Sequence, residues 1–328
     1  MRAVVVETYG PLEEAAVRDI PAPRPREGEV AIAVEAAGVN FPDILVMEGN
    51  YQVKPELPFT PGKEAAGVVT AVAPDVAGFH PGDRVAAQVE YGAYAQHMVV
   101  PACNVYALPD ALGFDEAAAL GLSYLTAHFA LRERARIGAG EKMLVLGASG
   151  GVGLAAVQLG SAFGVTVIGG TRGEGPARIV VEAGADHVVE LGKENLRDAL
   201  CEDVRRVTDG YGVDVVIDPV GGEPFAAALR CLAWCGRLVT VGFASGTIPE
   251  VRANYLLVKN ITVLGLQWSD YRDRRPDEVR TAQAEIFDFA VSGKLRPHIS
   301  AALPLDKFAD ALSLLRAGEA EGKLVLHP

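Results

Sequence analysis

Residues 142–153 read KMLVLGASGGVG, and this stretch decides the class of the fold. An apolar strand, KMLVL, runs into a glycine-rich turn and then into the helical stretch VGLAAVQLG. Glycines at such a turn let the backbone approach a pyrophosphate, and the free N–H groups at the helix N-terminus attract its charge. We therefore expect a dinucleotide-binding loop, with Ala148 at the first glycine position of GxGxxG, in which the contacts come from Ser149, Gly150, Gly151, Val152 and Gly153.

The segment around this loop alternates apolar strands with helices. Its nearly continuous apolar runs are KMLVLGA, VTVIGG, HVVEL, VDVVIDPV, GRLVTVGF and ITVLGLQW. Strands without polar alternation are expected to be buried on both faces, and alternation with helices is typical of a doubly wound parallel sheet. The sequence thus predicts an α/β protein in which residues 122–265 form a Rossmann domain with a six-stranded sheet.

Short β-rich runs, broken by proline and glycine, dominate the chain before residue 110. Examples are RAVVVE, VAIAVEAAG and DRVAAQV, which are separated by segments such as PRPREG and FHPGD. This spacing predicts a compact, barrel-like β-rich domain over residues 1–121. Residues 266–328 hold too few helical and strand-like stretches for a domain of their own, so we expect them to return and complete the first one.

The residues after the second predicted strand, VTVIGG, govern the choice between NAD and NADP. An NAD-selective site carries an acid about 20 residues beyond the glycine loop. This chain instead has Thr171 and Arg172 there, and Arg178 in the next helix. Two guanidinium groups and a hydroxyl suit a 2′-phosphate, so the sequence favours NADP. The alternatives are that both arginines are solvated and that Glu174 binds the ribose.

The composition disfavours several classes of protein. The 328 residues are 50% hydrophobic and 22% charged, which is typical of a globular chain. A formal net charge of -12 disfavours a nucleic-acid partner, because affinity for nucleic acid depends on Lys and Arg neutralising phosphates. No apolar run approaches the roughly 18 residues of a membrane span, and MRAVVVETYG is too short for a secretory signal, so we expect a cytoplasmic protein.

The four cysteines are Cys103, Cys201, Cys231 and Cys235, and they form no CxxC motif. At this density we expect buried thiols in a reducing compartment rather than a disulfide framework. The stretch CLAWC is predicted to place Cys231 and Cys235 on one face of a helix.

Motifs along nearly the whole chain resemble those of a known family. They are EAAGVNFPDILVMEGNY (35–51), PFTPGKEAAGVV (58–69), HPGDRV (80–85), GAYAQHMVV (92–100), LVLGASGGVGLAAVQLG (144–160), VVIDPVGG (215–222) and GKLVLHP (322–328). This combination resembles the zinc-free quinone oxidoreductase (zeta-crystallin-like) branch of the medium-chain dehydrogenase/reductase superfamily. The resemblance implies a GroES-like catalytic domain, built from both chain ends, around the Rossmann domain. It also implies a homodimer that forms through ITVLGLQW, the outermost Rossmann strand.

The zinc-dependent alcohol dehydrogenases of this superfamily carry a Cys and a His where this chain has Asn40 and Lys63. The cysteine-rich lobe that holds their structural zinc is also missing. An amide and an ammonium group are poor zinc ligands, so we expect no zinc. Without a Lewis acid, hydride transfer needs an acceptor that spreads charge over its own π-system, which favours quinones and α,β-unsaturated carbonyls.

The resemblance also implies roles for single residues. Asn40 would contact the nicotinamide ribose, Asp43 and Tyr51 would border the substrate pocket, and Lys63 is a candidate donor to the reduced oxygen. The alternatives are a helix N-terminal acid for Asp43, a loop aromatic for Tyr51 and a solvated loop residue for Lys63. Beyond the glycine loop, the expected cofactor contacts are Asn40, Thr126, Thr171, Arg172, Arg178, Phe243, Ala244, Leu266 and Lys323.

These inferences predict an NADPH-dependent, zinc-independent oxidoreductase that reduces quinones or similar conjugated carbonyls. One alternative is an enone or enoyl-thioester reductase with the same site. Another is a structural protein, like the lens crystallins of this family, that binds NADPH without useful turnover. An RNA-binding protein is a third alternative, which the acidic charge balance opposes.

Overall fold

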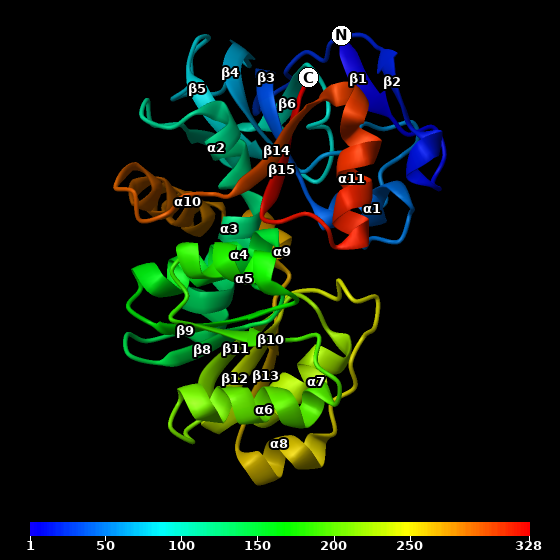
Figure 1. Ribbon diagram of the computed structural model, residues 1–328. Helices are drawn as coiled ribbons and strands as arrows, with labels where there is room; N and C mark the ends of the chain where they lie inside the picture. Colours follow the sequence, from blue (N-terminus) through cyan, green and yellow to red (C-terminus); the bar gives the residue numbers. More distant parts are fainter. The chain divides into compact units, whose positions relative to one another are not determined.

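The chain divides into two compact units in the computed structural model, which describes residues 1–328. Both termini belong to unit 1, and unit 2 is inserted between its parts (Figure 1). The chain passes from unit 2 back into unit 1 after Asp270. Unit 1 comprises Met1–Leu122, Tyr271–Gly293 and Pro297–Pro328, and unit 2 comprises Ser123–Asp270 and Lys294–Arg296.

Unit 1 contains a seven-stranded sheet in the order β14-β15-β3-β4-β5-β7, with β6 paired to β3. The two chain ends meet in this sheet, because β15 pairs antiparallel with β3, with Leu326 opposite Ala37. Strands β1 and β2 form a separate two-stranded sheet. The strands of unit 1 are β1 (Arg2–Val5), β2 (Ala16–Asp19), β3 (Glu29–Val39), β4 (Glu64–Val72), β5 (Arg84–Gln88), β6 (His97–Pro101), β7 (Val105–Ala107), β14 (Ile299–Pro304) and β15 (Lys323–His327).

Short helices flank these strands. The first α-helix, α1, starts where the Asn40 backbone N–H donates to the Asp43 side chain. Pro42 favours the first turn of α1, because a residue at that position has no helical acceptor for a backbone N–H. Helix α9 begins in unit 2 and ends in unit 1. The helices of unit 1 are η1 (Leu12–Glu14), α1 (Phe41–Met47), η2 (Ala102–Asn104), α2 (Phe114–Ala119), α9 (Trp268–Arg274), α10 (Pro276–Val291), η4 (Leu305–Lys307) and α11 (Phe308–Ala317).

Unit 2 contains a six-stranded, fully parallel sheet in the order β10-β9-β8-β11-β12-β13. The order reverses between β8 and β11, which is the crevice where doubly wound sheets bind ligands. The expectation of an α/β protein with this Rossmann sheet is confirmed. Its strands are β8 (Lys142–Val145), β9 (Thr166–Thr171), β10 (His187–Glu190), β11 (Val213–Asp218), β12 (Leu232–Thr240) and β13 (Thr262–Gly265).

Helices cover both faces of the Rossmann sheet. Figure 1 shows α4 and α5 on one face and α6 and α7 on the other. An apolar core lies between the sheet and α6 and α7, with Leu144, Val216 and Phe225 among its buried side chains. The helices of unit 2 are α3 (Leu122–Phe129), the π-helix η3 (Ala130–Ala135), α4 (Gly151–Ala162), α5 (Glu174–Glu182), α6 (Leu196–Val207), α7 (Gly222–Cys231) and α8 (Ala253–Lys259).

The prediction that Cys231 and Cys235 share one helix face is wrong. Helix α7 ends at Cys231, and Leu232 already pairs with Val213 as the first residue of β12. A register shift follows, and within it Cys235 adopts φ +61° and is exposed. Sheet pairing therefore overrides the helical spacing of the two cysteines.

None of the helices combines the length and the apolar character needed to cross a membrane.

Candidate functional site

The glycine-rich turn of unit 2 joins β8 to α4 and leaves the N-terminus of α4 open. Gly147 has φ +58°, which L side chains rarely adopt, and a Cβ on Gly153 would lie 2.1 Å from the Gly147 carbonyl oxygen. The first N–H groups of α4 have no acceptor within the helix. This turn can therefore hold a pyrophosphate. The residues that line it, all partly exposed, are Ser149, Gly150, Gly151 and Val152.

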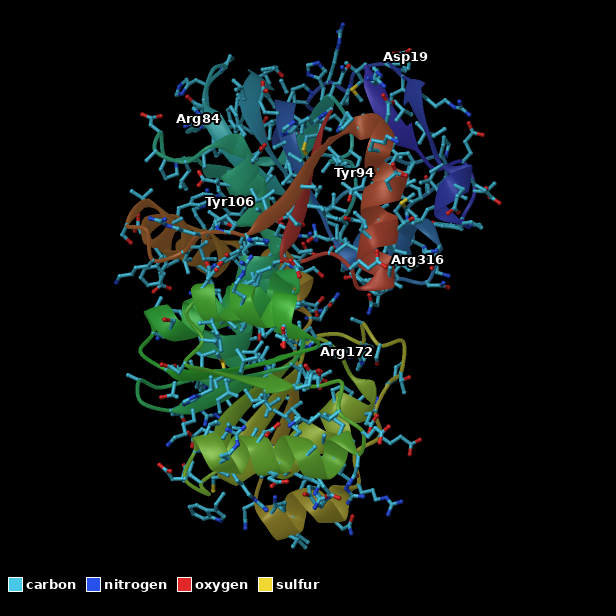
Figure 2. All side chains as sticks on the ribbon, in the orientation of Figure 1. Asp19, Arg84, Tyr94, Tyr106, Arg172 and Arg316 are labelled. Carbon is cyan, nitrogen blue, oxygen red and sulfur yellow. The ribbon has the colours of Figure 1, made fainter.

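The carboxyl end of β9 offers a donor set for a ribose or its phosphate. Thr171 ends the strand, is 2% exposed, and its Oγ1 has no hydrogen-bond partner. Arg172 follows it and is exposed (Figure 2). Glu190, at the end of neighbouring β10, fixes this turn because it accepts hydrogen bonds from the backbone N–H groups of Gly173 (2.9 Å) and Gly192 (2.6 Å). An orphaned hydroxyl beside an exposed guanidinium is suited to an anionic sugar.

Arg178 differs from Arg172 in having a partner on its own helix. Its Nε lies 3.7 Å from Glu182 Oε1 in α5, and the Arg178 side chain is 80% exposed. Glu174 is the first residue of α5 and is also exposed. Arg172 is therefore the stronger candidate for a phosphate ligand of the two arginines.

The turns after β11, β12 and β13 lie at the same edge of the sheet. Asp218 is 0% exposed, and its Oδ1 accepts hydrogen bonds from the backbone N–H groups of Val220 (2.8 Å) and Gly221 (2.9 Å). Burial raises the pKa of Asp218 to about 6. Asp218 thus fixes the turn before α7, and its Oδ2 has no partner.

The remaining predicted cofactor contacts of unit 2 occupy different environments. Phe243, after β12, is 40% exposed, and its neighbour Ala244 donates its backbone N–H to the Pro219 carbonyl oxygen (3.1 Å). Leu266, after β13, is buried, and so is Thr126 within α3. Phe243 is the side chain in this set with the largest surface left for a ligand.

In unit 1, the buried carboxylate of Glu64 is the centre of a polar network. Its Oε1 accepts hydrogen bonds from Asn40 Nδ2 (2.8 Å) and Lys323 Nζ (2.8 Å). Its Oε2 accepts hydrogen bonds from Gln88 Nε2 (3.3 Å) and from the backbone N–H of Leu122. The sheet register brings Glu64 and Gln88 together as direct partners across β4 and β5. Glu64 therefore links three strands of the sheet, β4, β5 and β15.

Lys323 uses all of its donors within this network. Its Nζ donates to the Val39 carbonyl oxygen (3.1 Å), to Asn40 Oδ1 (2.6 Å) and to Glu64 Oε1. An ammonium group has three N–H bonds, so none remains for a phosphate. Asn40 Nδ2 is shared between Glu64 and the Gly38 carbonyl oxygen (3.3 Å). The second lone pair of Asn40 Oδ1 is the part of this amide that remains available to a ligand.

Asp43 holds the start of α1. Its Oδ2 accepts hydrogen bonds from the Asn40 backbone N–H (2.9 Å) and from the Tyr94 hydroxyl (2.7 Å), and Tyr94 lies inside unit 1 (Figure 2). Burial raises the pKa of Asp43 to about 6, although the charges of Lys63 and Lys323 act in the opposite direction. These contacts favour the helix N-terminal acid among the alternatives for Asp43.

Lys63 is buried, so its interpretation as a solvated loop residue is wrong. Its Nζ donates to Glu90 Oε2 (2.5 Å) and to the Glu90 carbonyl oxygen (3.1 Å), and it lies 4.4 Å from the centroid of the Tyr51 ring. The other Glu90 oxygen accepts a hydrogen bond from Arg272 Nη2 (2.8 Å). The Lys63 ammonium group is thus fixed by Glu90 and lies beside the aromatic ring of Tyr51.

Five residues of the polar contacts in unit 1 were not among the candidate site residues from the sequence: Glu64, Gln88, Glu90, Tyr94 and Arg272. Tyr94 lies in the quoted motif GAYAQHMVV, which could have singled it out. Glu90 and Arg272 carry no local pattern. They meet Lys63 only through tertiary contacts, so no motif pointed to them.

The donor set of unit 1 does not suit a zinc ion. Asn40 and Lys63 stand where the resemblance puts a zinc-ligating Cys and His, and the ammonium groups of Lys63 and Lys323 repel a dication. The structure contains no group of three or more His, Cys, Asp or Glu side chains arranged to hold a metal.

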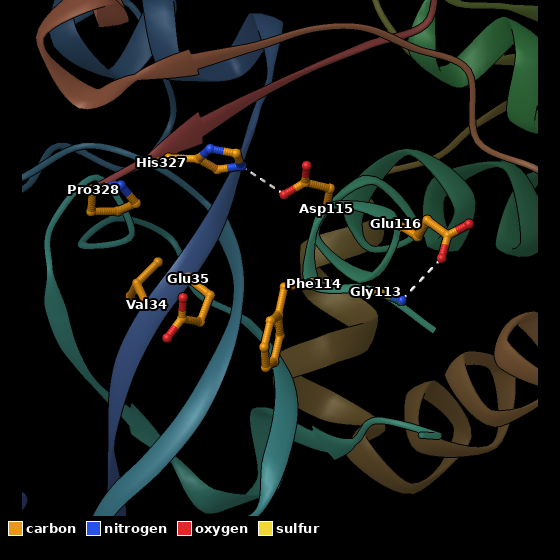
Figure 3. Close-up of a pocket in the computed structure, with 8 residues that line it drawn as sticks. All are labelled: Val34, Glu35, Gly113, Phe114, Asp115, Glu116, His327 and Pro328. Carbon is orange, nitrogen blue, oxygen red and sulfur yellow. Dashed lines mark hydrogen bonds and ion pairs between the residues drawn. The ribbon is translucent and has the colours of Figure 1, made fainter. Parts of the chain in front are cut away.

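One open pocket of about 500 Å³ lies in unit 1. Its lining includes three acidic residues, and His327 Nε2 lies 2.7 Å from Asp115 Oδ1 within it (Figure 3). None of the site residues predicted from the sequence lines this pocket. Its lining is Val34, Glu35, Gly113, Phe114, Asp115, Glu116, His327 and Pro328.

The chain combines a Rossmann unit, which has an open dinucleotide-binding turn, with a GroES-like unit, which has buried polar groups. This combination is typical of a two-domain oxidoreductase. Residues 26–110 match the alcohol dehydrogenase GroES-like domain, and residues 183–326 match a zinc-binding dehydrogenase domain. The chain belongs to the quinone oxidoreductase family of the medium-chain dehydrogenase/reductase superfamily, which confirms the resemblance of its motifs.

Similar proteins extend over nearly the whole chain. A quinone oxidoreductase-like protein 2 homolog of Nematostella vectensis is 40% identical over 302 residues, which are 91% of this chain and 81% of that protein. Human quinone oxidoreductase is 34% identical over 330 residues, or 99% and 97% of the two chains. The crystal structure of Escherichia coli quinone oxidoreductase complexed with NADPH superposes with a TM-score of 0.93 at 30% identity, covering 100% of both chains.

Proposed function

We propose that this oxidoreductase uses NADPH, needs no zinc, and reduces quinones or closely related conjugated carbonyls. The main support for NADPH over NADH comes from the residues at the carboxyl end of β9. The orphaned Thr171 hydroxyl and the exposed Arg172 guanidinium lie there, residues 171–173 include no acid, and the carboxylate of neighbouring Glu190 is occupied by backbone N–H groups. Relatives of this chain are named quinone oxidoreductases, and a similar structure contains NADPH, which supports the same proposal.

The residues of unit 2 fit NADPH. The N-terminal N–H groups of α4 would hold the pyrophosphate, and Gly153 keeps the backbone close enough for it. Arg172 would hold the 2′-phosphate, since a guanidinium can bind a phosphate through two parallel N–H bonds. Phe243 would lie against the cofactor from the turn after β12. Bound NADPH supplies the hydride for the reduction.

The residues of unit 1 would prepare the acceptor. Asn40 offers a lone pair on Oδ1 whose direction is fixed by Lys323 and Glu64. Lys63 Nζ lies 4.4 Å from the centroid of the Tyr51 ring, and Glu90 accepts two of its hydrogen bonds. A third N–H of Lys63 would donate to the acceptor oxygen as negative charge develops on it. Tyr51 would provide a flat apolar surface for a conjugated ring.

The same residues support the proposed zinc independence. A metal would have to displace an ammonium group from each of two ion pairs, Lys63–Glu90 and Lys323–Glu64, which have side chains at most 16% exposed. The acceptor must then delocalise its own charge, and quinones do this better than simple ketones. This is why we propose conjugated acceptors.

We further propose a homodimer that forms through β13. This strand is at the end of the sheet order and pairs only with β12, so its outer edge is open. Nearby, α8 has no buried residue, and Leu257 and Val258 in it are 78% and 77% exposed. An open strand edge with exposed apolar side chains is usually covered by another chain. Light scattering that gives 34.5 kDa in solution would contradict this proposal.

An acceptor panel tests the proposed activity. NADPH oxidation is followed with phenanthrenequinone, naphthoquinone, a simple enone, an enoyl thioester and a plain ketone, and each assay is repeated with NADH. We expect fast turnover of the quinones with NADPH and none of the plain ketone. Turnover confined to the enoyl thioester would establish the alternative reductase. NADPH binding in calorimetry without turnover of any acceptor would establish a binding protein.

A chelation experiment tests the metal. We expect full activity after exhaustive dialysis against a chelator, and no stoichiometric zinc in elemental analysis. Loss of activity together with bound zinc, restored by zinc alone, would overturn zinc independence.

A further inference from the structure

Two buried cysteines of unit 2 have their sulfur atoms in contact. Cys201 Sγ lies 3.2 Å from Cys231 Sγ. Cys201 is in α6, Cys231 is the last residue of α7, and they are 5% and 4% exposed. A disulfide bond is about 2.05 Å long, so roughly 1 Å of approach separates this contact from a covalent bond. Neither sulfur has a part in the proposed binding of NADPH or substrate.

The surroundings of the pair distinguish the two thiols. The hydrogen bond with Cys231 lowers the pKa of Cys201, and the nearby charges of Arg230, Arg205 and Lys259 act in the same direction, whereas burial opposes them. The pKa of Cys231 is raised, first by that same hydrogen bond and then by burial. The nearby positive charges favour the thiolate of Cys201, and the thiolate is the nucleophilic form of a cysteine.

The contact is also fixed by its neighbours. Arg230 Nη1 bonds Asp198 Oδ1 across α7 and α6 (3.1 Å), and Lys259 Nζ bonds the Arg230 carbonyl oxygen (3.2 Å). Cys231 Sγ also lies 3.4 Å from the Ala227 carbonyl oxygen, one turn earlier in α7. These hydrogen bonds therefore fix α6 and α7 with the two sulfur atoms facing each other.

We propose that Cys201 and Cys231 are a redox-active dithiol that closes to a disulfide between α6 and α7, with hydrogen peroxide as the oxidant. The Cys201 thiolate attacks one peroxide oxygen, the O–O bond breaks, and a Cys201 sulfenic acid and hydroxide form. Cys231 then attacks the Cys201 sulfur, an S–S bond forms and the S–O bond breaks. Two thiols lose two electrons and two protons, and peroxide becomes two molecules of water.

The full-length protein tests this directly. In a variant with Cys103→Ser and Cys235→Ser, which removes the two exposed thiols, the reduced protein is treated with hydrogen peroxide, and free thiols are then alkylated. We expect a chain that loses two hydrogen atoms in mass, yields a Cys201–Cys231 linked peptide, and regains both thiols with dithiothreitol. Recovery of both cysteines as alkylated or sulfinic species, without the linked peptide, would overturn the proposal.

A matched pair of variants tests which cysteine reacts first. In the same background, Cys231→Ser removes the resolving thiol, and Cys201→Ser removes the attacking one. With peroxide and dimedone, we expect the sulfenic acid adduct on Cys201 in the first variant and at least tenfold less adduct on Cys231 in the second. Equal labelling would overturn the assigned order of attack. If either variant fails to fold, the linked peptide in the parent protein still decides whether the disulfide forms.

Discussion

Replacement of Lys323 by methionine should destabilise unit 1 strongly and leave the cofactor preference unchanged. The ammonium group lies 2.8 Å from Glu64 Oε1, and the side chains of Lys323 and Glu64 are 3% and 1% exposed. Lys323→Met would leave the Glu64 carboxylate buried with neutral donors only, from Asn40, Gln88 and the Leu122 backbone. Breaking a buried ion pair in this way costs about 3–5 kcal/mol.

The assay has to report on unit 1. Both tryptophans, Trp234 and Trp268, belong to unit 2, so tryptophan fluorescence follows the other unit. Amide hydrogen exchange of peptides from β3, β4 and β15 reports on the affected sheet. A loss of about 3–5 kcal/mol raises the fraction of open molecules by roughly 100- to 4000-fold, at 1.4 kcal/mol per tenfold.

A double variant is the control for lost packing. Glu64→Gln combined with Lys323→Met removes both charges and keeps an amide within reach of the same donors. Replacing both partners of a buried pair is often nearly neutral, so exchange in β3, β4 and β15 should return most of the way to that of the parent protein. If the single and the double variant exchange equally fast, the loss of stability comes from lost packing of the Lys323 side chain and not from the unpaired Glu64 charge.

The same variant separates a structural role from a cofactor role. Because Lys323 has no N–H left for a phosphate, Lys323→Met should change the Michaelis constants for NADPH and NADH by similar factors. Unchanged hydrogen exchange, together with a loss of affinity for NADPH alone, would refute our reasoning. Lys323 would then contact the cofactor, as the family resemblance implied.

The Rossmann sheet could be predicted because its signals are local. Each strand is a continuous apolar run, and the turn after KMLVL needs glycines at defined positions, since Gly147 has φ +58° and a Cβ on Gly153 would meet the Gly147 carbonyl oxygen. The resemblance of motifs added the GroES-like domain, which short β-rich runs alone would not have identified.

The polar contacts of unit 1 could not be predicted, because they join residues far apart in the chain. Glu64 and Lys323 are 259 positions apart, and Glu90 and Arg272 are 182 apart. From the sequence alone, Lys63 cannot be distinguished from an ordinary exposed loop lysine, because its partner Glu90 is not a neighbour in the chain. The helix predicted through CLAWC failed for a related reason, since pairing of Leu232 with Val213 starts a strand directly after Cys231.

Three more site residues are tested one at a time, one of them with a comparison variant. Arg172→Ala should raise the Michaelis constant for NADPH by about 10- to 150-fold, since hydrogen bonds to a charged group contribute roughly 1.5–3 kcal/mol. The NADH reaction should stay nearly unchanged, and equal losses with both cofactors would mean that Arg172 only holds the turn. Lys63→Met should lower kcat for quinones by about 100-fold, the loss expected for a positioned acid. The control for Lys63→Met is Glu90→Gln, which keeps the Lys63 ammonium group. An equal loss of kcat in the two variants would mean that the loop around Glu90, and not the Lys63 charge, is needed for turnover. Asp43→Asn should change the pH dependence of stability, because burial raises the pKa of Asp43 from 3.8 to about 6. In that range the folded chain binds more protons than the unfolded one, so the contribution of Asp43 to stability falls as the pH rises from about 4 to about 6. The shift corresponds to roughly 3 kcal/mol at most. The amide introduced by Asp43→Asn keeps an acceptor for Tyr94 and for the Asn40 N–H but does not ionise, so the variant should gain stability relative to the parent protein between pH 4 and pH 7 in urea titrations. A stability difference that stays constant over this range would mean that Asp43 ionises in the folded protein at its ordinary pKa.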